Sequence, residues 1–240
     1  MKTLILPPKF SEESNLIRKA ALAKGWQVER LPSWRIPEHL HGIPVAIYGE
    51  PLFVAHVEEV LGIRFPVPPE DWLLQLPAEL VLRKIMAMPL SEARLLEDRW
   101  FVKPADYKTF KAGVFPNGAA LPSEEEAPGQ DLTLISEVVH WESEFRFFMR
   151  EGKAVTGSVY FRNGQTAEED GAWISSSEEF QQARAIAEQA FAATADVLPG
   201  TVVIDTGYIR GKGWAVIEAN PAWGSGLYGS DPVLVLEVLG

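Results

Sequence analysis

The chain has 240 residues, of which 47% are hydrophobic and 23% charged, the composition of an ordinary globular protein with a sizeable core. Its formal net charge of −11 argues against general attraction to nucleic acid or to an anionic membrane, because the mean field repels phosphates. Cysteine is absent, the apolar start is too short for a signal peptide and no apolar run matches a membrane span, so a cytoplasmic protein is expected.

The first 80 residues predict a small α/β unit. Residues 3–6 form a short apolar strand, and Ser11 offers an N-cap for a helix that ends near Gly25. Two more strands are expected over residues 26–31 and 44–48, followed by a helix from Pro51. This alternation of strands and helices indicates a separate domain over residues 1–80.

Residues 81–240 predict an α+β domain with an antiparallel sheet. Apolar or alternating runs indicate its strands, which cover residues 80–88, 99–104, 132–139, 144–150, 154–162, 202–205 and 214–220. Asn163-Gly164 and the segment 211–213 predict hairpin turns. Ser176 and Glu179 form a capping box for a long helix that Pro199-Gly200 would end.

Three oxygen-bearing side chains on the last two strands form the main candidate site. Glu218 and Asn220 are two apart and share one face of their strand, while Asp205 falls roughly opposite them across the hairpin. Two carboxylates and an amide suit a hard cation such as Mg²⁺. Alternatively, Asp205 caps a turn and the other two lie on a solvated face.

Asp205, twelve intervening residues and then Glu218-Ala-Asn220 resemble the metal signature of the ATP-grasp superfamily, which includes D-alanine–D-alanine ligase. The resemblance implies an ATP-grasp fold over residues 81–240, with residues 1–80 as the pre-grasp domain. It also implies that Asp205, Glu218 and Asn220 bind Mg²⁺ ions that bridge the phosphates of ATP.

Other positions match the same family in the expected order. Lys103, after Trp100-Phe-Val, resembles the lysine that contacts the ATP phosphates, although a lysine at a strand end often only reaches for solvent. Glu137 with the backbone of Val138 and Val139 resembles the adenine-binding hinge. Glu144 matches the carboxylate that accepts the ribose hydroxyls. Glu137 and Glu144 also fit a pair of surface acids.

The run from Phe101 to Val114 is similar to one branch of the superfamily whose core holds an arginine and two lysines. The resemblance implies that Lys103 and Lys108 are the lysines and that Arg83 or Arg146 is the arginine. The chain departs from the D-alanine ligase pattern at Val203, where that family carries an arginine near the transferred phosphoryl group. Arg146 or Arg162 is a candidate substitute.

The resemblance implies an ATP-dependent, Mg²⁺-dependent carboxylate–amine ligase that forms an acyl phosphate and releases ADP and phosphate. A small molecule or a peptide would supply the carboxylate and the amine; the sequence names neither, nor the oligomeric state. A glycine-rich loop over residues 221–231 is expected to contact substrate, or else to be a plain loop around a packed tryptophan. Its candidate contacts are Trp223, Ser225, Gly226 and Tyr228.

Two other functions remain open. One is a catalytically reduced ATP-binding regulatory module, which Val203 favours. The other is a glycosidase with Glu137 and Glu144 as its carboxylate pair, which the lysines fit badly. Magnesium dependence and nucleotide turnover would separate the three.

Overall fold

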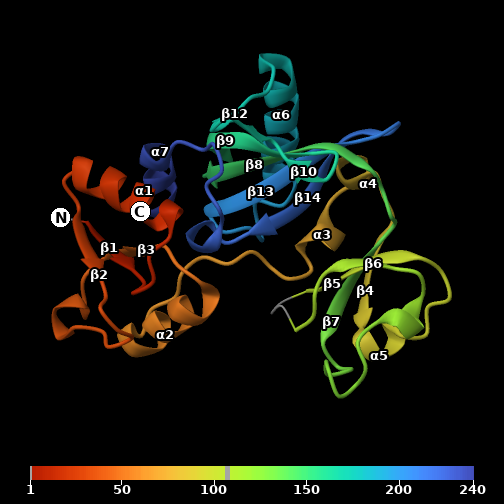
Figure 1. The fold of residues 1–240 in the computed structure, drawn as a ribbon, viewed down its shortest axis with the longest axis horizontal. Coiled ribbons are helices and arrows are strands. Elements are labelled where there is room, and N and C mark those ends of the chain that lie inside the picture. The colour runs from red at the N-terminus through yellow and green to blue at the C-terminus, as the bar shows by residue number, and fades with distance from the viewer. Residues whose placement is uncertain (1, 106–108) are drawn as a thin grey trace.

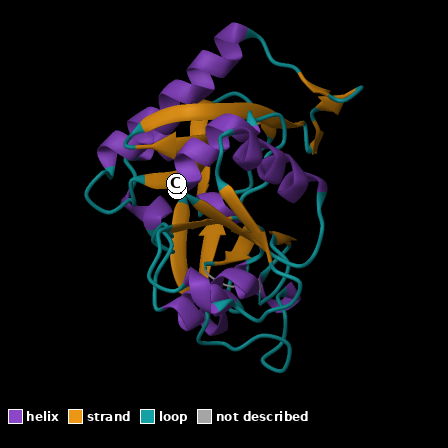
Figure 2. Ribbon diagram, turned by 90° about the vertical axis from the view of Figure 1, so that its left-hand side faces the viewer, coloured by secondary structure: helices purple, strands orange, loops and turns teal. Residues whose placement is uncertain are grey.

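The computed structural model describes residues 2–105 and 109–240. These residues form three units, which we call the N-terminal unit, the small lobe and the large sheet (Figure 1). Viewed from the side of the N-terminal unit, strands run through the middle of the molecule and most helices lie outside them (Figure 2). No helix in the described ranges is long and apolar enough to cross a membrane.

The N-terminal unit holds a three-stranded parallel sheet in the order β2-β1-β3. Its elements are β1 (Thr3–Leu6), α1 (Glu12–Ala23), β2 (Gln27–Arg30), η1 (Glu38–Leu40), β3 (Val45–Ile47) and α2 (Pro51–Leu61). Ser11 makes the expected N-cap of α1, and Gly62 ends α2 in the left-handed conformation. The α/β character predicted for this part is therefore present.

The chain returns to the N-terminal unit at its end. Helix α7 (Pro232–Leu239), which the sequence analysis missed, packs against α1 (Figure 1). Val235 and Leu236 of α7 are fully buried with Leu4 and Ile17 of the N-terminal unit. The helix is short and hydrophobic on most sides, so its sequence shows no clear amphipathic period.

A connecting segment leads to the small lobe. It contains α3 (Trp72–Gln75) and α4 (Ala78–Val81), and the Trp72 indole N–H donates to Thr194 Oγ1 at 2.8 Å. The small lobe is an antiparallel sheet in the order β4-β7-β5-β6. Its elements are β4 (Ile85–Pro89), α5 (Leu90–Ala93), β5 (Trp100–Pro104), β6 (Gly113–Phe115), η2 (Gly118–Ala120) and β7 (Leu132–Ser136).

The strand predicted over residues 80–88 is wrong in its first part. Residues 78–81 form one helical turn, Leu82 adopts φ +49°, and the strand begins at Ile85. Leu80 and Val81 are both buried, and a short apolar run of this kind fits a buried helix as well as a buried strand.

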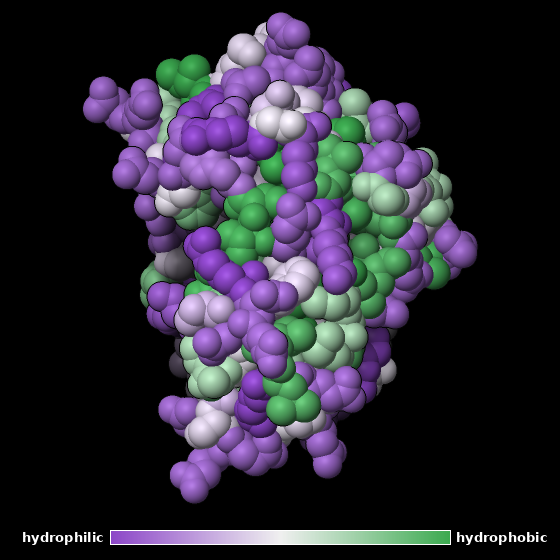
Figure 3. Space-filling model, turned by 90° about the vertical axis from the view of Figure 1, so that its right-hand side faces the viewer, coloured by the Kyte–Doolittle hydropathy of each residue, from purple (hydrophilic) through white to green (hydrophobic). Residues whose placement is uncertain are grey.

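Figure 3 views the molecule from the side on which the small lobe lies. Hydrophobic residues gather in the middle of this face.

The large sheet has five antiparallel strands in the order β10-β9-β8-β13-β14. These are β8 (Trp141–Arg150), β9 (Lys153–Arg162), β10 (Gln165–Thr166), β13 (Thr201–Ile209) and β14 (Gly213–Asn220); a hairpin of β11 (Glu168–Glu169) and β12 (Ala172–Trp173) follows β10. Helix α6 (Ser177–Ala193) covers one face, and the Ser176–Glu179 capping box is present. This helix ends at Thr194, whose hydroxyl donates to Ala190 O, before Pro199.

Candidate functional site

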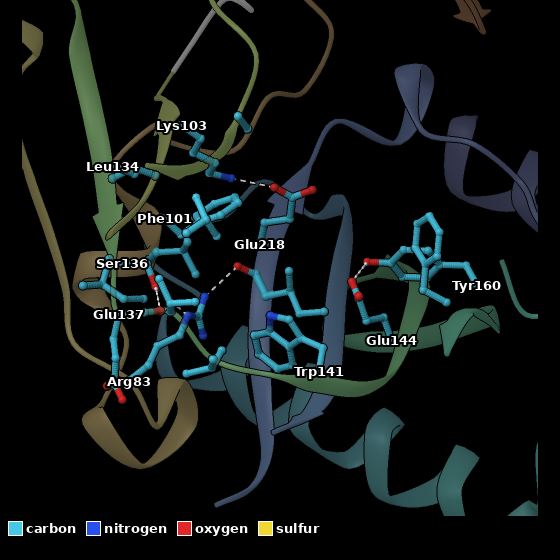
Figure 4. Close-up of a pocket in the computed structure, with 18 of the residues that line it drawn as sticks. Arg83, Phe101, Lys103, Leu134, Ser136, Glu137, Trp141, Glu144, Tyr160 and Glu218 are labelled. Carbon is cyan, nitrogen blue, oxygen red and sulfur yellow. Dashed lines mark hydrogen bonds and ion pairs between the residues drawn. The ribbon is translucent and has the colours of Figure 1, made fainter. Parts of the chain in front are cut away.

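A cavity of about 480 Å³ lies between the small lobe and the large sheet. Its apolar lining residues include Phe101, Leu134 and Trp141. Lys103 reaches in from β5, and Glu218 faces it from β14 (Figure 4). Glu144 and Tyr160 line the side away from Arg83 and Glu137 (Figure 4).

A row of charged side chains crosses three neighbouring strands of the large sheet. Arg146 on β8 is directly opposite Asp205 on β13, and Asp205 is directly opposite Glu218 on β14. Strand alternation explains the row: Phe145 and Phe147 point to the core under α6, so Arg146 points to the other face. The apolar residues on each strand thus fix which face the charges occupy.

Arg146 and Asp205 form a buried two-point ion pair. Arg146 Nε donates to Asp205 Oδ1 at 2.9 Å, and Nη2 donates to Oδ2 at 2.6 Å. Burial alone would lower the pKa of Arg146, but Asp205 outweighs it and raises the pKa. The Arg146 guanidinium also lies 5.4 Å and 5.2 Å from the ring centres of Tyr160 and Tyr228.

Glu218 has two other partners. Lys103 Nζ lies 2.6 Å from Glu218 Oε2, and Asn220 Nδ2 donates to Glu218 Oε1 at 3.0 Å and to Asp205 Oδ2 at 3.5 Å. Burial would raise the pKa of Glu218, yet Lys103 and Asn220 lower it to about 2. The structure thus brings Asp205, Glu218 and Asn220 together in front of Lys103; their function stays a prediction.

A β-bulge in β14 lets two successive residues, Ile217 and Glu218, both line the cavity. Asp205 pairs with Glu218 and Thr206 with Val216, which leaves Ile217 as the extra residue. Arg83 holds this bulge, because its guanidinium donates to Val216 O at 2.6 Å and to Ile217 O at 3.1 Å. Burial lowers the pKa of Arg83 to about 10.

Arg83 is therefore bound to backbone carbonyls, and the candidate catalytic arginine at the acidic row is Arg146. The Arg83 guanidinium also lies 5.1 Å from the centre of the Trp141 ring and lines the cavity. Sequence reasoning could not choose between Arg83 and Arg146. The hydrogen bonds that hold Arg83 on β14 depend on the bulge, which no sequence pattern predicted.

The predicted hinge residues lie along the cavity. Glu137, Val138 and Val139 follow β7 and line it, with Glu144 further along the chain. The Glu137 carboxylate pairs with Lys212 Nζ at 2.7 Å, which lowers the pKa of Glu137. Glu144 accepts from the Tyr160 hydroxyl at 2.9 Å, and burial raises the pKa of Glu144.

The glycine-rich loop, residues 221–231, divides its candidates between two environments. Trp223 is buried with the N-terminal unit and donates from its indole to Pro66 O at 3.0 Å. Ser225 is buried, donates to Pro221 O, and its carbonyl accepts from the Tyr48 hydroxyl at 3.0 Å. In contrast, Tyr228 lines the cavity, and Gly226 O accepts from Arg146 at 3.4 Å.

Contacts from the N-terminal unit to this loop were not anticipated. Glu13 on α1 accepts from Leu227 N at 2.7 Å and from the Tyr48 hydroxyl at 3.3 Å. Tyr228 adopts φ +49°, a conformation rare for a bulky residue. Its ring stacks on Tyr160 at 5.0 Å between centres and meets the edge of Trp173 at 5.3 Å. No local sequence pattern signals these long-range contacts.

Three further candidates have different outcomes. Lys108 lies outside the described residues. Arg162 binds Glu179 through both terminal guanidinium nitrogens, at 2.9 and 3.0 Å. Val203 is fully buried and pairs with Phe148 and Asn220 in the sheet, so Arg146 on the adjacent strand is the arginine that reaches the acidic row.

The donor set fits magnesium in its chemistry. Glu218 lines the cavity and Asn220 is bonded to it, and carboxylate and amide oxygens are ligands that a hard cation takes. Both Asp205 oxygens already accept from Arg146, so a direct Asp205 ligand requires one of these hydrogen bonds to break. Within residues 2–105 and 109–240, no group of three or more His, Cys, Asp or Glu side chains is placed to hold a metal ion.

Comparisons with known proteins agree with this architecture. The family model "ATP-grasp domain, R2K clade family 2" matches residues 80–238, which is more than half of the chain. No curated protein matches the chain by sequence.

Among solved structures, the chain is similar to D-cycloserine synthetase DcsG, with a TM-score of 0.65, 14% identity and coverage of 99% of this chain and 98% of that one. A RimK domain ATP-grasp protein from Sphaerobacter thermophilus gives 0.65, 13% identity and complete coverage of both chains. D-alanine–D-alanine ligase from Bacillus anthracis gives 0.57 and 11% identity, with 99% and 95% covered. These TM-scores show a shared fold and, at such low identities, the fold alone; it is the ATP-grasp fold expected from the sequence. The chain belongs to the ATP-grasp superfamily, within R2K clade family 2.

Proposed function

We propose that the protein is an ATP-dependent ligase that joins a carboxylate to an amine through an acyl phosphate. The observation that carries the proposal is the row of Arg146, Asp205 and Glu218, which faces Lys103 across one end of a partly apolar cavity. The cavity volume of about 480 Å³ suits a nucleotide-sized ligand.

The nucleotide is proposed to lie along the cavity from residues 137–139 to Lys103. The base would pack against Phe101, Leu134 and Trp141, next to the backbone of residues 137–139. Glu144 would accept the ribose hydroxyls. The phosphates would reach Lys103, whose ammonium would exchange its contact with Glu218 for one with phosphate oxygens.

Magnesium would be held by Glu218 and Asn220, with Asp205 joining if Arg146 releases an oxygen, and it would offset phosphate charge. In the reaction, an oxygen of the substrate carboxylate attacks the γ-phosphorus, and ADP leaves. The amine nitrogen then attacks the acyl carbon, inorganic phosphate leaves, and the amine loses a proton. Lys103, Lys108 and Arg146 are the cations proposed to stabilise the transferred phosphoryl group.

The acceptor end of the cavity is proposed to lie near Gly226 and Tyr228. Trp223 and Ser225 are less suited to contact substrate, because both side chains are buried and hydrogen-bonded inside the loop and its support. The N-terminal unit would help to select the substrate, since Glu13 and Tyr48 hold this loop. We retain 1–80 and 81–240 as proposed domains, with α7 docked on the first, and the cytoplasm as the proposed location.

The test measures nucleotide binding and turnover together. We expect Mg²⁺ with a non-hydrolysable ATP analogue to raise the melting temperature, and Glu218→Gln or Lys103→Met to remove most of that shift. Glu168→Gln, which changes an exposed acid on β11, is the matched control and should behave as wild type. Phosphate release from ATP should then increase with a pool of amino acids and short peptides, and mass spectrometry should detect a new amide.

An ATP-binding regulatory module is the second candidate, favoured by the buried apolar surroundings of Val203. Nucleotide binding without phosphate release across the substrate pool would support it over the ligase. A protein that binds no nucleotide, or whose Glu218→Gln variant binds as well as wild type, would refute the assigned site.

A further inference from the structure

Tyr160 is held in place on three sides beside the cavity. Its ring stacks on Tyr228 with centres 5.0 Å apart and planes 22° apart, and it meets the edge of Phe161 at 5.2 Å. The Arg146 guanidinium lies 5.4 Å from the same ring. Only 6% of Tyr160 is exposed, so the direction of its hydroxyl is set by packing.

That hydroxyl points to Glu144. Tyr160 O–H donates to Glu144 Oε2 at 2.9 Å, at the opposite end of the cavity from Arg83 and Glu137 (Figure 4). Among the described residues, no other donor is within hydrogen-bonding distance of this carboxylate. Oε2 takes this bond, which leaves Oε1 for a ligand in the cavity.

The surroundings of Glu144 otherwise work against a carboxylate ion. Burial raises the pKa of Glu144, Asp205 and Glu218 add to that rise, and the Tyr160 hydrogen bond opposes it. A buried acid with acidic neighbours needs a donor to stay ionised and to keep one orientation. Tyr160 supplies that donor from the adjacent strand, where Glu144 pairs with Phe161.

We infer that Tyr160 is a positioning residue that holds the Glu144 carboxylate toward the ribose hydroxyls, and that preference for a ribonucleotide over its 2′-deoxy counterpart depends on it. The inference rests on the proposed function, because Glu144 has a ribose to bind only if the cavity takes a nucleotide. Tyr160 itself need not touch the nucleotide; it acts through Glu144.

Tyr160→Phe removes the hydroxyl and keeps the ring that stacks on Tyr228. We expect the affinity for ATP to fall about fivefold to tenfold, since a hydrogen bond to a charged group is lost or misaligned. The affinity for 2′-deoxyATP should fall less, because it lacks the 2′-hydroxyl and keeps only the 3′-hydroxyl as a donor to Glu144. The ratio of the two affinities should therefore approach one.

The experiment titrates ATP and 2′-deoxyATP, each with Mg²⁺, into wild type and variants by calorimetry. Tyr208→Phe is the matched control: it removes a tyrosine hydroxyl from β13, where the Tyr208 ring contacts Trp214 away from the cavity lining, and it should keep the wild-type ratio. Glu144→Gln should also lower the ratio, and Tyr160→Phe added to Glu144→Gln should have no further effect on it.

Several outcomes would overturn the inference. Equal losses of ATP and 2′-deoxyATP affinity in Tyr160→Phe would make Tyr160 a structural residue only. A wild-type protein that binds both nucleotides equally would refute the proposed preference for ribose over 2′-deoxyribose, while leaving the ligase proposal in place. A wild-type protein that binds neither nucleotide would refute both. If Tyr160→Phe melts well below wild type, the decision passes to Glu144→Gln. An unchanged ratio of ATP to 2′-deoxyATP affinity in Glu144→Gln would then refute the inference.

Discussion

The buried pair of Arg146 and Asp205 makes the stability of the protein sensitive to one side chain. Arg146→Met keeps an unbranched, mainly apolar stem but removes both hydrogen bonds to Asp205, which has a side-chain exposure of 1%. The buried carboxylate then has no cation bonded to it, and breaking a buried pair in this way costs about 3–5 kcal/mol. For a chain of this size, the loss corresponds to a melting temperature lower by roughly 6–20 °C.

Urea denaturation followed by tryptophan fluorescence measures the change. Arg150→Met is the matched control, because Arg150 lies on the same strand but is exposed, and its loss should cost less than about 1 kcal/mol. Asp205→Asn in the Arg146→Met background should recover part of the stability, since it removes the unpaired charge. Strictly additive effects of the two substitutions would refute a coupled pair.

The same variant has a predictable pH dependence. Burial raises the pKa of Asp205 and Arg146 opposes the rise, so without Arg146 the folded-state pKa lies further above the unfolded value. The folded variant then binds a proton that the unfolded chain does not, and its stability should increase as the pH falls through that raised pKa. A deficit relative to wild type that stays constant from neutral pH to pH 4.5 would contradict the reasoning.

Three further substitutions test other parts of the structure. Glu144→Gln should raise the melting temperature of the nucleotide-free protein at pH 7–8, because burial raises the pKa of Glu144; the gain should vanish as the pH falls through that pKa, and a scan at several pH values checks it. Ser176→Ala should cost about 1 kcal/mol by calorimetry, since Ser176 caps α6, whereas Ser177→Ala should cost less. Gly157→Ala should cost about 1–3 kcal/mol of stability in urea denaturation, because the added Cβ would lie 2.4 Å from the Phe147 ring and 2.6 Å from Arg146 O. Gly171→Ala is the control: Gly171 has φ +79° and open space around it, so this substitution should show the cost of backbone strain alone.

Residues close in sequence could be assigned to the site because strand periodicity and pairing carry that information. Glu218 and Asn220 had to share a face, and the hairpin at 211–213 had to bring Asp205 roughly opposite them; the register pairs Asp205 with Glu218 and Val203 with Asn220. The family membership and the ATP-grasp fold expected from these motifs are confirmed as well. The strand prediction was wrong at residues 80–84, because the apolar run there does not distinguish a helical turn from a strand.

Features that depend on long-range packing could not be predicted. The bulge at Ile217 is a property of two paired strands, so the hydrogen bonds from Arg83 to its carbonyls have no local signal. The partnership of Tyr160 with Glu144 requires the register between β8 and β9. The bond from Leu227 to Glu13 joins residues that are 214 positions apart. Propensity and spacing contain no information on such contacts.

Glu13 and Tyr48 fasten the glycine-rich loop to the N-terminal unit, and α7 packs against α1 directly after that loop. The glycine-rich loop, residues 221–231, is thus held by hydrogen bonds at its centre and by helix packing after its end, although its composition is typical of a flexible loop. Its amide hydrogens should consequently exchange with solvent as slowly as those of α1 and α7, in one cooperative unit with them. Tyr228 itself also stacks on Tyr160 of the large sheet, so this loop joins the N-terminal unit to the polar side of the cavity.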